Sequence, residues 1–105
     1  MTLKGSEKQI AWAQDIINAF VEFLDKEIAE QEAASARRLA KKGVRSSIAD
    51  MRKAEAEAIK AQIIEAKELD AAKVIERGKG VQKALSIEGA MDIYNIEGAW
   101  KAITR

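Results

Sequence analysis

A run of cations in the middle of the chain is the strongest chemical signal in the sequence. Residues 37–53 hold seven basic side chains and a single acid, Asp50, which gives this segment a net charge of +6. The seven are Arg37, Arg38, Lys41, Lys42, Arg45, Arg52 and Lys53. Grouped Arg and Lys can hold a phosphate backbone, or an acidic protein surface, through charge-assisted hydrogen bonds. The plain alternative is a solvated helix end, which also collects cations.

The other residue types argue against catalysis. The chain has no His and no Cys, which removes thiol nucleophiles, a histidine base and zinc sites built on these ligands. Carboxylate pairs such as Glu27 with Glu30 lie near a Lys and are typical of solvated surface charge. Gly78-Lys79-Gly80 matches the start of a dinucleotide-binding loop, but no strand is expected before it. We therefore predict no enzyme activity, no cofactor and no metal.

Length and net charge restrict the class of protein further. A chain of 105 residues has room for one domain, which we expect to span residues 1–105. Its net charge of +1 is too small for a protein that coats duplex DNA and too positive for one that imitates DNA. No apolar run approaches the roughly 20 residues that a membrane helix needs. These features predict a soluble, cytoplasmic protein with no membrane partner.

Helix-forming residues must position the cations. The absence of Pro and the abundance of Ala, Glu, Lys and Arg predict an all-α fold. Ser6 and Gln9 form a capping-box pattern, and Gly43 suits a left-handed cap, so a first helix is expected over residues 7–42. Its apolar face is wide and should pack against two neighbours. This face contains Ile10, Trp12, Ile16, Ile17, Phe20, Val21, Phe23, Leu24 and Ile28.

A second helix is expected to return alongside the first. Ser46 or Ser47 can cap it, and the Gly78-Lys79-Gly80 turn should end it, which gives the range 47–77. A short C-terminal helical segment should fold back onto this pair, with Trp100 in the core. The predicted architecture is thus a long antiparallel helical hairpin with a short segment packed on it. The basic run then lies at the tip of the hairpin, on a surface poor in apolar residues.

The apolar face of the first helix also bears on self-association. Ile10, Ile17, Val21 and Ile28 could form a dimer seam as readily as an intramolecular core. The length of the hairpin and the width of this face favour a homodimer.

The opening residues carry a resemblance. The segment Gly5-Ser6-Glu7-Lys8-Gln9-Ile10-Ala11-Trp12-Ala13 resembles the G-[ST]-E-K-Q-I-x-W-A start of small phage and mobile-element proteins of bacteria. In its opening residues and its small size, the chain is similar to anti-CRISPR proteins, which are short, cofactor-free binders of nucleases such as Cas9. The resemblance implies non-catalytic inhibition inside the bacterial host cell, with the basic tip on the Cas9 effector or its guide RNA complex.

Two other classes of protein fit the same residues. A nucleic-acid-binding accessory protein of a mobile element would use the tip cations on a phosphate backbone, with an affinity that falls as salt rises. A structural coiled-coil or assembly component would oligomerise through its helices and would not need the basic tip.

Overall fold

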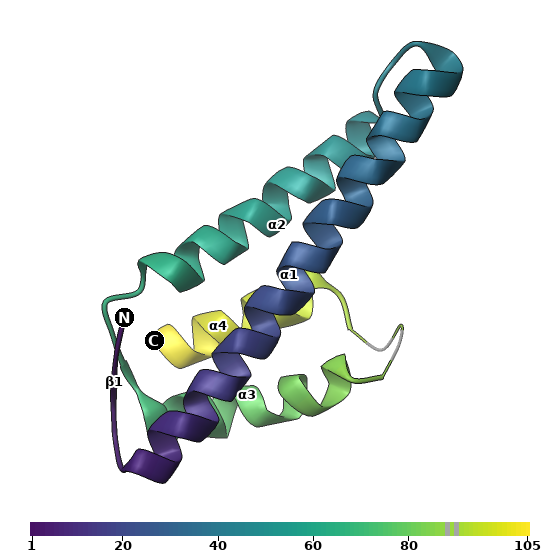
Figure 1. Cartoon of the computed structure of the whole chain (residues 1–105). Helices are drawn as coiled ribbons and strands as arrows, with labels where there is room; N and C mark the ends of the chain where they lie inside the picture. Colours follow the sequence, from purple (N-terminus) through teal and green to yellow (C-terminus); the bar gives the residue numbers. More distant parts are fainter. Residues whose placement is uncertain (88, 90) are drawn as a thin grey trace.

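The computed structural model describes residues 1–87, 89 and 91–105, and it confirms the all-α fold class (Figure 1). Its elements in chain order are β1 (Thr2–Lys4), α1 (Glu7–Lys42), α2 (Ser47–Glu65), β2 (Glu68–Asp70), α3 (Ala71–Leu85) and α4 (Ile93–Thr104). α1 and α2 form the expected hairpin, and α3 and α4 pack against its lower half (Figure 1). Among the described residues, none of the helices has the length and apolar character needed to cross a bilayer.

Local capping sets the bounds of α1. Ser6 Oγ accepts a hydrogen bond from the Gln9 backbone N–H at 3.2 Å, and Gln9 Oε1 accepts one from the Ser6 N–H at 3.0 Å. At the other end Gly43 adopts the left-handed conformation, with φ 73°, and its N–H donates to the Leu39 carbonyl at 2.9 Å. The bounds predicted for the first helix are therefore confirmed.

The prediction of a second helix over 47–77 is wrong, because α2 ends at Glu65. Ala66 is extended, and residues 68–70 pair in parallel with the N-terminal strand, with Leu3 opposite Leu69. Asp70 then accepts a hydrogen bond from the Ala72 N–H at 3.0 Å and starts α3. A segment of good helix formers is thus interrupted by pairing with residues more than sixty positions away in the chain.

The Gly78-Lys79-Gly80 segment lies inside α3 and does not end a helix, which corrects a second expectation. Gly78 is buried, and a Cβ built on it would lie 2.8 Å from Ile16 Cγ2. The missing side chain lets α3 pack closely on α1. This glycine serves a helix contact, and α3 continues past it to Leu85.

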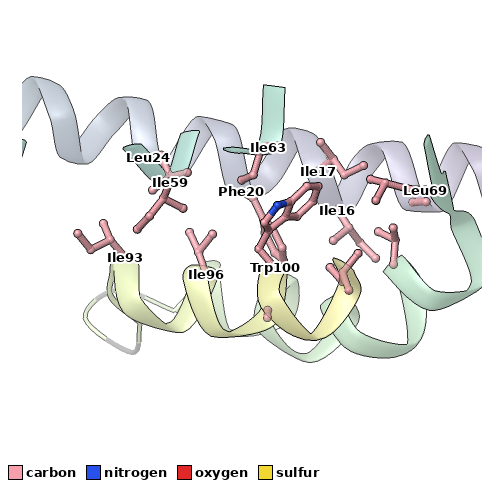
Figure 2. Close-up of a cluster of buried hydrophobic side chains, with 14 of the residues drawn as sticks. Ile16, Ile17, Phe20, Leu24, Ile59, Ile63, Leu69, Ile93, Ile96 and Trp100 are labelled. Atoms are coloured by element: carbon pink, nitrogen blue, oxygen red, sulfur yellow. The ribbon is translucent and has the colours of Figure 1, made fainter. Parts of the chain in front are cut away.

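The core contains side chains from all four helices (Figure 2), and these helices come together in the lower half of the hairpin (Figure 1). Large buried side chains come from every helix, among them Ile16, Phe20, Leu24, Ile59, Ile63, Val74, Ile96 and Trp100. Trp100 is 3% exposed, as predicted, whereas Trp12 is 47% exposed and lies outside the core. Ile17 belongs to the core, and Ile10, Val21 and Ile28 pack against it. Of the four residues predicted for a dimer seam, Ile17 is therefore buried in the chain's own core, and the other three stay partly exposed.

Candidate functional site

The end of α1 projects beyond the start of α2, and this creates the hairpin tip, defined here as residues 36–53 (Figure 1). The two helices meet at the buried Ser35, whose Oγ accepts a hydrogen bond from the Ser46 N–H at 3.0 Å. The same hydroxyl donates to the Ser46 carbonyl at 3.4 Å. Residues 36–42 continue past this point for two turns of helix, about 10 Å at 1.5 Å per residue. Side chains on these turns are open to solvent.

Four of the seven predicted cations lie on these projecting turns. Arg37, Arg38, Lys41 and Lys42 are all exposed. At 100° per residue their positions cover an arc of about 140°, so they form one continuous side of the helix. Within the described part of the chain, none of the four forms an ion pair with a carboxylate. These four cations lie together on the projecting helix end, and they are called the tip cations below.

Arg45 and Lys53 instead bind carboxylates of the protein itself. Arg45 Nη2 lies 2.6 Å from Glu32 Oε2 and 3.0 Å from Asp50 Oδ1. Lys53 Nζ lies 3.2 Å from Glu32 Oε2 and 3.9 Å from Glu57 Oε1. These contacts connect α1, the loop and α2 at the base of the tip. Both cations therefore support the tip and are not free to hold a ligand.

The pKa values of the two acids at this base reflect the same contacts. Hydrogen bonds from Arg45 and then Lys53 lower the pKa of Glu32 below its ordinary value. The pKa of Asp50 is lowered as well, first by Arg45 and second by the hydroxyl of Ser35. Both carboxylates therefore stay charged over the neutral pH range. The ion pairs of Arg45 and Lys53 with Glu32 and Asp50, called the brace below, stay intact over the same range.

Arg52, the seventh predicted residue, is exposed on α2 and near another cluster. Tyr94 of α4 donates a hydrogen bond from its hydroxyl to Glu55, and this bond raises the pKa of Tyr94. Arg52 lies near enough to oppose that rise. Arg52 therefore lies on α2 near Tyr94, and within the described residues it forms no ion pair with a carboxylate.

The sequence analysis missed the apolar side chains on the tip. Leu39, Val44, Ile48 and Met51 are each between 45% and 64% exposed. Ile48 and Met51 lie about 100° and 160° around the helical wheel from Ala49, which is buried. The expectation of a tip poor in apolar residues is therefore wrong. The tip offers cations together with apolar contact area.

The four exposed tip cations could together bind an anionic ligand. In residues 1–87, 89 and 91–105, no three acidic side chains gather closely enough to hold a metal ion. The projecting helix end presents positive charge that can contact several phosphates or carboxylates at once.

Comparison with known proteins gives no relative: neither a protein-family model, a curated protein nor a solved structure matches this chain.

Proposed function

We propose that this protein acts by non-catalytic binding, and that the tip cations contact the phosphate backbone of a nucleic acid. The observation that supports this is the division of the basic run. Arg45 and Lys53 are neutralised by acids at the base, while Arg37, Arg38, Lys41 and Lys42 remain exposed on a projecting helix end. If Arg37, Arg38, Lys41 and Lys42 served only to cap the end of α1, the ion pairs of Arg45 and Lys53 that support this end would have no evident purpose.

The partner that we propose is the guide RNA complex of a Cas9-type nuclease in the bacterial cytoplasm. This part rests on the resemblance of the opening residues to small phage proteins and on the small size of the chain. Such a complex presents an RNA backbone within a protein surface, so it offers phosphates to the tip cations and apolar area to Leu39 and Val44. Binding there would inhibit the nuclease without any chemical step.

The salt dependence of binding tests the phosphate contact. Fluorescence anisotropy with a labelled RNA duplex, and with the Cas9 guide RNA complex, would be recorded over a series of salt concentrations. If all four tip cations contact phosphates of a duplex, the logarithm of the binding constant should fall with the logarithm of salt at a slope of about −3 to −4. Changing the four to Ala should remove most of that slope.

A matched variant controls for the change in net charge. Lys26, Lys67, Arg77 and Lys83 are exposed and lie outside the tip, and their change to Ala removes the same four charges. We expect this control to retain binding and to retain inhibition of plasmid cleavage by Cas9, while the tip variant loses both. Equal effects of the two variants would contradict the tip as the contact surface. Binding to free duplex without inhibition of any Cas9 tested would favour the accessory protein of a mobile element.

A further inference from the structure

A groove between the start of α1 and α3 is a second surface, separate from the tip. Its volume is ≈ 480 Å³. The lining residues are Lys8, Gln9 and Trp12 from α1, and Ala72, Ile75, Glu76 and Lys79 from α3. On α1 the lining residues precede Ile16, and on α3 they lie on both sides of Gly78, which packs closely on Ile16. The groove is therefore formed by two helices whose relative position is fixed by a tight packing contact.

The floor of the groove is apolar and includes a large exposed side chain. Trp12 is 47% exposed, in contrast to the buried Trp100. Ile75 is partly buried and packs against the core from the facing helix. An exposed Trp beside an aliphatic side chain is the kind of residue that dominates the binding energy of protein interfaces.

Two contacts within the protein position parts of the lining. The side chain of Gln9 is fixed by its hydrogen bond with the Ser6 N–H at 3.0 Å. The turn of α3 that carries Ile75 and Lys79 is fixed by the packing of Gly78 on Ile16. A preformed surface of this kind loses little conformational entropy on binding.

The charges on the walls are not balanced within the molecule. Lys8 and Lys79 are exposed, and neither forms an ion pair with any residue that the structure describes. Glu76 is the single acid on the lining. An occupant with carboxylates near the two ammonium groups would be complementary to this rim.

We infer that this groove binds an acidic amphipathic helix of a partner protein. Apolar side chains of that helix would pack on Trp12 and Ile75, and its carboxylates would pair with Lys8 and Lys79. The α3 lining from Ala72 to Lys79 extends about 10 Å, or two turns of helix, which suits anchors at positions i, i+3 or i+4, and i+7. Single-stranded nucleic acid fits less well, because its bases stack on successive aromatic residues and the lining has only Trp12.

The test uses two synthetic amphipathic peptides of equal length with identical Leu positions. One carries Glu on its polar face and the other carries Lys. Calorimetry with the wild-type protein should show saturable binding of the Glu peptide and at least about tenfold weaker binding of the Lys peptide. In a Trp100→Phe variant, where Trp12 is the only tryptophan, the Glu peptide should shift the tryptophan emission.

Variants locate the site and separate it from the tip. Trp12→Ala should weaken binding of the Glu peptide at least about tenfold, and because Trp12 is half exposed this change should leave the fold intact. The double change Lys8→Glu and Lys79→Glu should reverse the preference between the two peptides. The matched control, Lys26→Glu with Lys83→Glu, should leave it unchanged, as should Ala at the four tip cations.

Three results would overturn the inference. The first is the absence of binding by the Glu peptide, or equal binding of both peptides. The second is binding of an oligothymidine that depends on Trp12, which would assign the groove to single-stranded nucleic acid. The third is self-association that is lost in Trp12→Ala, seen by analytical ultracentrifugation, which would assign it to a second copy of the chain. None of these results bears on the tip.

Discussion

Gly78 and Gly80 lie two residues apart in α3 and have opposite effects on its stability. A Cβ on Gly78 would meet Ile16 Cγ2 at 2.8 Å and Phe20 Cζ at 3.4 Å. A Cβ on Gly80 would meet no atom within 4 Å. One glycine is therefore required for helix packing, while the other lowers helix propensity with no compensating contact.

Alanine substitutions separate these two roles. Gly78→Ala should lower the free energy of unfolding by about 1–3 kcal/mol, because the added methyl group overpacks the contact with α1. Gly80→Ala should raise it by about 0.5–1 kcal/mol, because Ala loses less backbone entropy in a helix. The midpoints of urea unfolding, followed by circular dichroism, measure both. A stable Gly78→Ala variant would show that α1 and α3 do not pack as closely as described.

Two tryptophans show what residue type predicts and what it does not. Both are large apolar residues on amphipathic helices, and both were expected on apolar faces. Trp100 is buried in the core cluster, whereas Trp12 is exposed and lines the groove between α1 and α3. A helical wheel gives the side of a helix, but the neighbouring helix decides how far around that side burial extends.

At the scale of elements, the stability of the ion pairs at the base of the tip depends on pH. The pKa values of Glu32 and Asp50 are lowered from ordinary values of 4.5 and 3.8, chiefly by Arg45. A carboxylate with a lowered pKa in the folded state stabilises that state above its ordinary pKa, and this stabilisation is lost as pH falls through the lowered value. The brace should therefore hold at neutral pH and weaken only in acid.

Carboxyl carbon NMR tests this brace directly. The pKa of Glu32 should lie below 4.5 and that of Asp50 below 3.8. The Arg45→Gln change should raise both pKa values. Amide hydrogen exchange in residues 43–46 should become faster in the same variant at neutral pH. Arg37→Gln is the matched control, since Arg37 is exposed and outside the brace. If Arg45→Gln left both titrations unchanged, the ion pairs would not form in solution.

The elements also show where prediction from the sequence succeeds. The ends of α1 follow from Ser6, Gln9 and Gly43, which act within a few residues of themselves. The end of α2 does not follow from local signals, because residues 66–70 contain no Gly or Pro. The helix ends there because residues 68–70 pair with Thr2–Lys4. Asp70 was the one local sign of a new helix start.

At the scale of the whole molecule, the projecting hairpin makes the protein elongated. Its principal extents are 53 × 27 × 19 Å and its radius of gyration is 15.5 Å, whereas a compact chain of this length would have a radius of gyration of about 13 Å. The upper part of the hairpin lies beyond the four-helix core and contributes this length (Figure 1).

Small-angle X-ray scattering should distinguish this shape from an association of two chains. We expect a radius of gyration near 15.5 Å and the forward scattering of a single chain, because Ile17 is buried in the chain's own core and Ile10, Val21 and Ile28 pack on it. A homodimer would double the forward scattering and raise the radius of gyration. That result would overturn the expectation of a single chain and would confirm the homodimer predicted from the sequence.

The sequence by itself determined the helical character, the ends of the first helix and the position of the basic run at a hairpin turn. Each depends on properties of short segments, such as helix capping, helix propensity and local charge. Only the tertiary structure decided which cations are free, because Glu32 lies thirteen residues before Arg45 and twenty-one before Lys53. It also decided the break after α2, the packing role of Gly78 and the exposure of Trp12. These depend on surfaces that meet only when the chain has folded.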